Sequence, residues 1–160
     1  LGDVYKRQGW MRSEGAIQFT LTVAKHAIGL QSPVPDQLAV ARYLETADVE
    51  AHLQRVRPVY AERARAMYAE LERVLPDGAQ VTRPDGGMFL WARLGHGIDT
   101  TRLLEMAVEE GVAFVPGASF YAHDPDTSTM RLSFVTHAPD VIREGVERLA
   151  SAIERYQREN

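Results

Sequence analysis

The sequence of 160 residues contains no cysteine, which excludes disulfide bonds, thiolate metal sites and a cysteine nucleophile. It also lacks any apolar run of the eighteen or more residues that cross a bilayer, and its longest conspicuous run covers only residues 88–92. The first ten residues include Asp3, Lys6 and Arg7, where a signal peptide would need an apolar core. We therefore expect a cytoplasmic protein that has no membrane partner.

An excess of positive charge is missing as well, because 18 lysines and arginines face 22 aspartates and glutamates, for a formal net charge of -4. Domains that bind nucleic acids usually carry clustered excess lysine and arginine, so no nucleic-acid partner is predicted. With 45% hydrophobic and 25% charged residues, the composition is that of a globular chain rather than a disordered or collagen-like one. A complete enzyme, a binding module and a piece of a larger protein all stay open.

Hydrophobic periodicity predicts an α+β fold in which helices pack on a small sheet. Apolar residues recur at helical spacing in five segments, and they alternate or run together in four shorter ones. The expected helices cover residues 16–28, 36–44, 49–74, 99–110 and 139–156, and the expected strands cover residues 80–83, 88–93, 112–115 and 130–135. Turn residues between the first two strands predict a hairpin.

Four local features give sharper expectations. The dense apolar pattern of residues 16–28 predicts a mostly buried helix that ends at Gly29, and Asp36 is expected to cap the next helix. Pro58 should kink the long helix or mark a junction between two segments. The continuous apolar run at residues 112–115 suits a central strand that is buried on both faces.

The sequence gives little support for a metal, phosphate or nucleophile site. The five histidines share no i,i+4 pairing, which predicts scattered surface histidines and no metal site. The segment from Asp124 to Thr127 offers calcium-like oxygens but lacks the glycine and closing glutamate of an EF-hand loop, so we expect a solvated turn. Gly95-His96-Gly97 does not complete a dinucleotide fingerprint, and the chain has no Gly-x-Ser-x-Gly elbow.

Arg131 is the charged residue with the most suggestive position, because it lies between Met130 and Leu132 on an otherwise apolar strand. Its guanidinium either reaches the rim of the sheet or meets an anion, and its planar fork suits a carboxylate. The alternative is an ordinary arginine on the solvent-facing side of a half-buried strand. The pattern alone leaves both interpretations open.

Three motifs, in matching order and spacing, resemble the C-terminal part of fold type I pyridoxal-phosphate aminotransferases, nearest to the 2-aminoadipate and kynurenine aminotransferase type. They read RPDGGMFLW at residues 83–91, GVAFVPGASFY at residues 111–121 and MRLSF at residues 130–134. Further matches lie on the long helix and the final helix, at His52, Arg57, Tyr60, Arg63, Glu144, Gly145 and residues 148–150. Several weak motifs in register make the resemblance specific.

This resemblance implies the small C-terminal domain of the fold type I aminotransferase fold, of α+β class, with a long interdomain helix. Residues 1–8 would be a non-native or disordered segment, the alternative being a native loop. Residues 9–47 would be a remnant of the large domain and interdomain helices, and residues 48–160 the small domain. The parent protein would be a homodimer that moves an amino group from an amino acid to a 2-oxo acid, with pyridoxal phosphate held mainly by the large domain.

The resemblance also assigns roles to individual residues. It implies that Arg131 pairs with the α-carboxylate of the substrate and that Phe89 lies near the substrate side of the cleft. Arg7 falls at the position of the arginine that contacts the cofactor phosphate, provided that residues 1–8 are native.

The lysine that forms the Schiff base in the family lies shortly before that arginine, which places it ahead of Leu1. Neither Lys6 nor Lys25 fits this position. Amino transfer needs this lysine as Schiff-base partner and proton shuttle, so the chain should contain no catalytic residue and should be inactive by itself.

Two other interpretations remain. MocR-type transcription regulators fuse a winged helix to the same fold and use it to sense effectors. They tend toward Gly-Leu-His where this chain has Gly86-Gly87-Met88-Phe89, and this difference favours the enzyme. The third interpretation is an α+β interaction domain that binds no cofactor.

Overall fold

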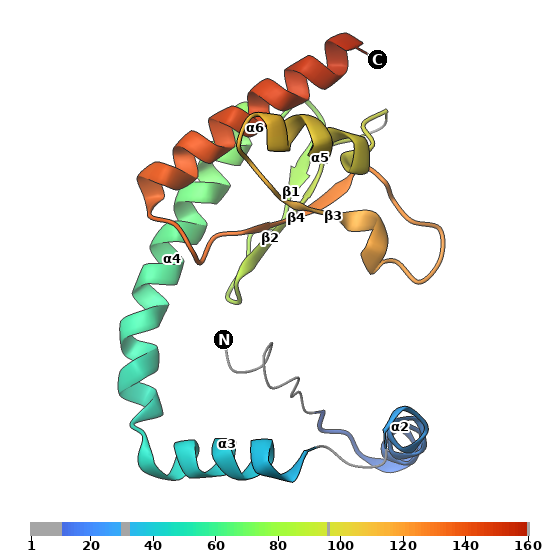
Figure 1. Cartoon of the computed structure of the whole chain (residues 1–160), viewed down its shortest axis with the longest axis vertical. Coiled ribbons are helices and arrows are strands. Elements are labelled where there is room, and N and C mark those ends of the chain that lie inside the picture. Colours follow the sequence, from blue (N-terminus) through green and yellow to red (C-terminus); the bar gives the residue numbers. More distant parts are fainter. Residues whose placement is uncertain (1–10, 30–32, 96, 160) are drawn as a thin grey trace. The chain divides into compact units, whose positions relative to one another are not determined.

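The computed structural model describes residues 11–29, 33–95 and 97–159. The chain divides into two compact units, one up to Leu53 and one from Gln54 onward. In chain order the elements are α2 (Gly15–Ile28), α3 (Val34–Thr46), α4 (Val49–Val74), β1 (Gln80–Val81), β2 (Phe89–Arg93), α5 (Thr100–Glu109), β3 (Val115–Pro116), the 3-10 helix η1 (Gly117–Phe120), β4 (Thr129–Ser133) and α6 (Pro139–Glu159) (Figure 1). The predicted α+β class is therefore confirmed.

The second unit is built on an antiparallel sheet with the strand order β1-β2-β4-β3. β1 pairs with β2, as the turn residues between them predicted. β4 lies in the middle, where Arg131 stands directly opposite Trp91 of β2 on one side and Val115 of β3 on the other.

The expectation of a central strand at residues 112–115 is wrong. β3 is a two-residue edge strand, and Val115 is 39% exposed. The start of the run is used elsewhere, because the Val112 amide donates to the Ala107 carbonyl at 2.8 Å and closes the end of α5. Pro116 has no N–H to donate to a ladder, so it is tolerated at the edge of a sheet but not in its middle.

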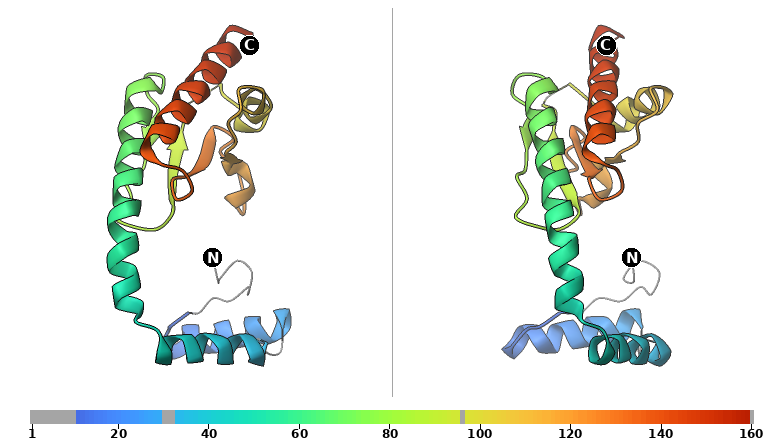
Figure 2. Two further views of the ribbon diagram at one scale, coloured as in Figure 1. Left: turned by 60° about the vertical axis from the view of Figure 1, so that its left-hand side comes forward. Right: turned by 90° about the vertical axis from the view of Figure 1, so that its left-hand side faces the viewer.

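One hydrophobic core fills the second unit between one face of the sheet and the helices α4, α5 and α6. Alternation along the strands turns Leu90, Ala92, Met130 and Leu132 toward this core. Figure 2 shows the C-terminal half of α4 next to α6, and Arg73 of α4 forms an ion pair with Glu147 of α6 at 3.3 Å.

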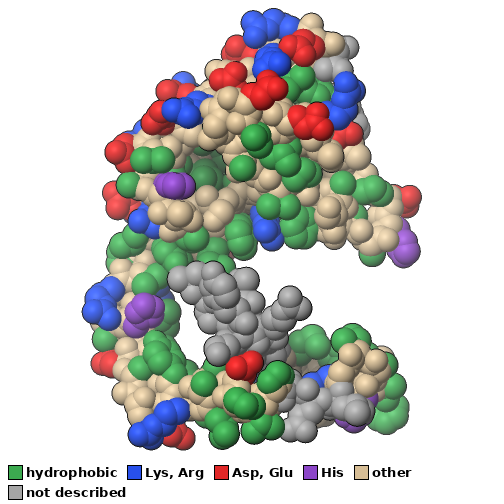
Figure 3. All heavy atoms as spheres, in the orientation of Figure 1, with side chains coloured by type: hydrophobic (Ala, Val, Ile, Leu, Met, Phe, Trp, Pro, Cys, Tyr) green, Lys and Arg blue, Asp and Glu red, His purple; other side chains and the backbone are tan. Residues whose placement is uncertain are grey.

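Helix α6 contributes the largest share of this core. Proline opens the helix at a position where its missing N–H costs little. The buried side chains recur three or four residues apart and are Ile142, Val146, Leu149, Ala152, Ile153 and Tyr156. Burying each of the larger aliphatic side chains stabilises the fold by about 1.5–3 kcal/mol. Figure 3 shows acidic and basic side chains interspersed on the outer surface of this helix.

The first unit differs from its sequence prediction. Helix α2 ends at Gly29 as expected, but none of its residues is buried in this chain, and Phe19 is 74% exposed. The apolar pattern correctly predicted a helix, but the expectation that this helix is mostly buried is wrong for the residues that the structure describes. Asp36 was expected to cap α3, but the helix begins at Val34 after Pro33, so Asp36 lies inside the first turn.

Helix α4 runs without interruption from Val49 to Val74, with Pro58 in its interior. The alternative that Pro58 marks a junction between two separate helices is therefore wrong. Among the described residues, no helix combines the length and hydrophobicity that a bilayer crossing needs.

Candidate functional site

The face of the sheet that points away from the core carries the candidate site. Strand alternation places Phe89 and Trp91 of β2 on this face together with Arg131 of β4. Phe89 pairs with Ser133 and is therefore the diagonal neighbour of Arg131, whereas Trp91 is directly opposite it. Phe89 and Arg131, which the resemblance assigned to one site, therefore lie side by side on the same face of the sheet.

The guanidinium of Arg131 lies among aromatic rings. Its Cζ atom is 4.2 Å from the centroid of the Phe89 ring and 4.8 Å from that of Phe120. Both distances are within the range of cation–π attraction, which is worth about 0.5–1 kcal/mol at exposed sites. Two aromatic side chains from different elements therefore surround the charge that the sequence placed on an apolar strand.

The Nε atom of Arg131 is buried and has no hydrogen-bond partner. Among the residues that the structure describes, no other buried side-chain nitrogen or oxygen lacks a hydrogen-bond partner. A buried donor without an acceptor costs about 1–3 kcal/mol, and more when it is charged. The arrangement favours an acceptor that arrives from outside, and a carboxylate can accept from Nε and a terminal nitrogen of the same guanidinium together.

Phe120 and Trp91 complete the cluster, and neither was assigned a role from the sequence. The Trp91 and Phe120 rings meet edge to face, with centroids 5.5 Å apart and planes at 81°. The Tyr121 ring is also near Trp91, at 6.4 Å between centroids. The segment after β3 begins with the short helix η1, which carries Phe120 at its last position.

Gly117 explains how η1 can lie so close to the sheet. A Cβ atom built on this residue would stand 2.7 Å from the Thr129 Cβ and 2.8 Å from its carbonyl oxygen, and closer still to its Oγ1 atom. Only glycine permits this approach of η1 to β4. In the sequence, Pro116-Gly117 is typical of an ordinary turn. It does not indicate that Gly117 packs against Thr129.

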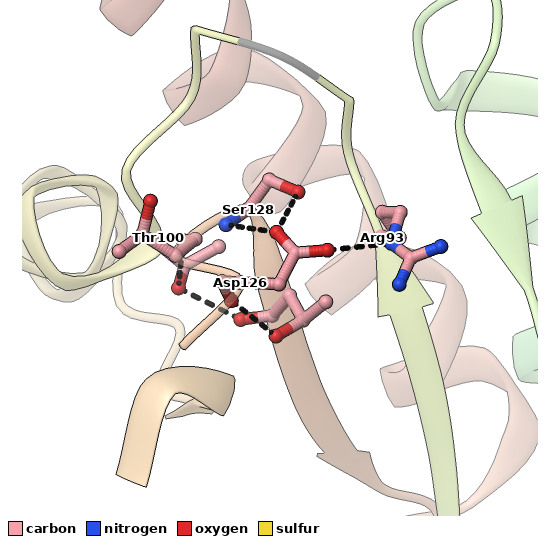
Figure 4. A network of polar contacts seen from close by, with 6 residues as sticks. Arg93, Thr100, Asp126 and Ser128 are labelled. Carbon is pink, nitrogen blue, oxygen red and sulfur yellow. Dashed lines mark hydrogen bonds and ion pairs between the residues drawn. The ribbon is translucent and has the colours of Figure 1, made fainter. Parts of the chain in front are cut away.

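A polar network holds the loop before β4 (Figure 4). Arg93 Nε donates to Asp126 Oδ2 at 2.7 Å, and Asp126 Oδ1 accepts from the Ser128 hydroxyl at 2.6 Å and amide at 3.0 Å. The hydroxyl of Thr129 donates to the Asp126 carbonyl at 2.7 Å, and the buried Thr100 hydroxyl bonds to the Thr129 carbonyl at 2.8 Å. The start of β4, against which Gly117 packs, is thereby fixed.

The same network lowers the pKa of Asp126. The largest cause is the hydrogen bond from the Ser128 hydroxyl, and the Ser128 amide and the Arg93 guanidinium act in the same direction against the effect of burial. Asp124, Pro125 and Thr127 of this turn are exposed, as expected of a solvated turn, whereas the partly exposed Asp126 carboxylate is hydrogen-bonded to protein donors. Among the residues described, no three histidine, aspartate or glutamate side chains are placed to hold a metal ion.

Two residues of the matching pattern on α4 contact the segment that follows β4. The Tyr60 ring meets the Phe134 ring edge to face at 6.4 Å, and Arg63 Nη1 donates to the Val135 carbonyl. These contacts join the end of β4 to α4, on which both residues lie. They stabilise the strand that carries Arg131.

The residues considered for the cofactor are one arginine and two lysines of the N-terminal part of the chain. Arg7 lies outside the described residues, as does Lys6. Lys25 is exposed on α2, and the sequence contains no lysine after it. The unit that carries Arg131 therefore contains a guanidinium that can bind a carboxylate, but it contains no lysine that could form a Schiff base with a carbonyl group.

Comparison with known proteins gives a consistent result. The family model described as aminotransferase class I and II matches residues 15–149. An aromatic-amino-acid aminotransferase of Thermococcus litoralis is 39% identical over 92% of this chain and 35% of its own length. The crystal structure of an α-aminoadipate aminotransferase of Thermus thermophilus, solved with N-(5'-phosphopyridoxyl)-L-leucine, superposes with a TM-score of 0.74 at 37% identity, over 92% of this chain and 38% of that one.

A more distant match is a probable rhizopine catabolism regulatory protein of Rhizobium meliloti. It is 32% identical over 72% of this chain and 24% of its own length. The chain spans about a third of the length of the curated aminotransferases that it matches.

Proposed function

This chain belongs to the class I and II aminotransferase family, and on that premise we propose that its second unit binds the substrate carboxylate in a pyridoxal-phosphate-dependent amino transfer. The family inferred from the three motifs is confirmed, and so is its α+β fold. The proposal concerns what this part of the fold does: Arg131 is the anchor for the α-carboxylate.

The buried and unpartnered Nε atom of Arg131 carries this proposal. A carboxylate that reaches the guanidinium satisfies this donor and gains charge-assisted hydrogen bonds. An amino acid and the 2-oxo acid made from it share the same α-carboxylate. One arginine can therefore hold both the amino donor and the oxo acceptor in the same orientation, as a reversible amino transfer requires.

Phe89 has a complementary role in the proposed site. Its ring is 4.2 Å from the Arg131 Cζ atom, and part of it remains exposed on the outer face. An apolar ring at this place excludes water from the guanidinium, which strengthens the attraction to a carboxylate in the less polar surroundings. The exposed part of the ring is free to contact the rest of the substrate.

The described residues do not fit the cofactor itself. Pyridoxal phosphate, which the family uses, supplies the electron sink for amino transfer when it is bound. The second unit contains no lysine for its carbonyl carbon, and Lys25 is exposed on α2. We therefore assign to this chain only the binding and orientation of the substrate.

We extend the proposal to a longer protein that contains this chain. In that protein, residues 9–47 belong to the large domain and interdomain helices, residues 48–160 form the small domain, and residues 1–8 are not native. The active enzyme is a cytoplasmic homodimer, and this chain alone does not transfer amino groups. This assignment is supported by the length of the chain, which spans about a third of the relatives that it matches.

The coding sequence upstream of this chain tests the proposal first. A large α/β domain that ends in Ser-x-x-Lys shortly before Leu1 is expected for the enzyme. A winged helix further upstream would instead favour an effector-sensing regulator, a second candidate supported by the match to the regulatory protein of Rhizobium meliloti. In the regulator, Arg131 would hold the carboxylate of an effector.

A kinetic experiment on the longer protein then tests Arg131. The variant Arg131→Lys keeps the charge but loses the two-pronged contact, so we expect kcat/KM for amino acids to fall roughly 10- to 100-fold. Cofactor absorbance should be unchanged, because the ligand proposed for Arg131 is the substrate and not the cofactor. An unchanged KM for amino acids in this variant would contradict the assignment.

A further inference from the structure

We propose that Phe120 is a positioning residue that holds the Arg131 guanidinium ready for a carboxylate, and that Gly117 makes this possible. The inference rests on the proposed function of Arg131 and adds the means by which the side chain is kept in place. Phe120 acts through Arg131 and takes no part in the chemistry.

The first argument is a closed set of contacts around the guanidinium. Phe120 lies 4.8 Å from the Arg131 Cζ atom and packs edge to face against Trp91 at 5.5 Å. Trp91 is in turn the direct cross-strand partner of Arg131. Phe120 is therefore held beside the guanidinium by its contact with a ring of the sheet.

The second argument is that the position of Phe120 is set by the backbone. η1 spans four residues, begins at Gly117 against Thr129 and ends at Phe120. Thr129 is fixed in turn by the bonds of its hydroxyl and carbonyl to Asp126 and Thr100. The glycine thus sets the distance between η1 and β4, and this distance places the ring beside the guanidinium two residues further along β4.

The physical consequence is a smaller cost of binding. A free arginine side chain has many rotamers and a hydration shell, and a carboxylate must select one rotamer and displace water. Contacts with Phe89 and Phe120 restrict the side chain and cover part of its surface before the ligand arrives. Removing one ring should weaken carboxylate binding about two- to fivefold.

The experiment is an NMR titration of this chain with sodium acetate, with acetamide as the neutral control of the same shape. The Nε–Hε signal of Arg131 is identified as the one that disappears in Arg131→Lys. In the unmodified chain we expect a signal shifted upfield by the neighbouring rings, which moves on addition of acetate and stays in place with acetamide.

The variant Phe120→Leu should return this signal toward those of exposed arginines and raise the acetate dissociation constant about two- to fivefold. Phe120→Tyr keeps the ring and should restore both values, which a general loss of packing would not allow. Phe19→Leu removes an exposed phenylalanine of α2 and serves as the matched control that changes neither value. If Phe120→Leu fails to fold, Phe120→Met replaces it with the same expected result.

Two results would overturn different statements. An Arg131 signal and an acetate affinity that are the same with and without the Phe120 ring would refute the positioning role while the proposed function stands. Acetate that leaves the Arg131 signal of the unmodified chain in place would refute the carboxylate site itself. In that case the signal in Phe120→Leu still reports whether the ring contacts the guanidinium.

Discussion

The two units of the chain use similar residues with opposite results. Helices α2 and α3 of the first unit contain no buried residue, although α2 carries isoleucine, phenylalanine, leucine and valine and α3 carries leucine and valine. Helix α6 of the second unit buries six side chains. The difference teaches that an apolar pattern specifies a helix that needs a partner, whereas burial depends on whether the chain supplies that partner. The second unit supplies it with a sheet and two further helices.

The largest expected effect comes from changing the same residue type in both units. Leu149→Ala empties a fully buried position of α6 and should lower the free energy of unfolding by about 2–5 kcal/mol. Leu38→Ala in α3, where the side chain is 64% exposed, should change it by less than about 0.5 kcal/mol. Urea denaturation followed by circular dichroism measures both, and equal effects would remove the contrast between the units.

A smaller effect on stability is expected at Gly117, where η1 lies close against β4. Gly117→Ala forces a Cβ atom against Thr129 and should destabilise the chain by about 1–3 kcal/mol. It should also change the near-ultraviolet circular dichroism of the aromatic cluster, because Phe120 moves away from Trp91. Gly86→Ala is the matched control, since a Cβ atom there meets no other atom within 4 Å. A stable Gly117→Ala variant with an unchanged spectrum would show that η1 can lie elsewhere.

The smallest effect concerns a polar contact near the surface of the second unit. The pKa of Asp126 is lowered in the folded chain, so its stabilising effect is present above the ordinary value of 3.8 and is lost as the pH falls through the folded value. Asp126→Asn should therefore destabilise the chain at pH 7, by about 1 kcal/mol or less because the carboxylate is partly exposed. The difference from the unmodified chain should shrink below about pH 4. A constant difference between pH 7 and pH 3 would assign the effect to packing instead of charge.

The sequence predicted the parts of this fold that depend on local pattern. Alternation along residues 130–135 singled out Arg131, the family resemblance added Phe89, and Pro139 marked the start of α6. The order of strands in the sheet was beyond this reasoning, because periodicity does not encode pairing. The run ending at Val115 therefore looked central when it lies at the edge.

The remaining part of the site depends on contacts between distant segments. Phe120 reaches Arg131 only because η1 approaches β4 at Gly117, a distance that no property of residues 117–120 alone determines. Trp91 likewise became part of the cluster through the register of β2 with β4. A charged residue can be found by its unusual place in a pattern, but the side chains that hold it become visible only in the folded chain.

Arg131 and the aromatic rings beside it lie on different elements, which has a consequence for how substrate specificity can change. The charge of Arg131 comes from the central strand, whereas the rings beside it come from β2 and from η1. As proposed, Arg131 of β4 holds the carboxylate that every amino acid has in common, and the exposed part of the Phe89 ring of β2 contacts the rest of the substrate. On that proposal, substitutions of Phe89 alter the preference for a substrate side chain while Arg131 still holds the carboxylate.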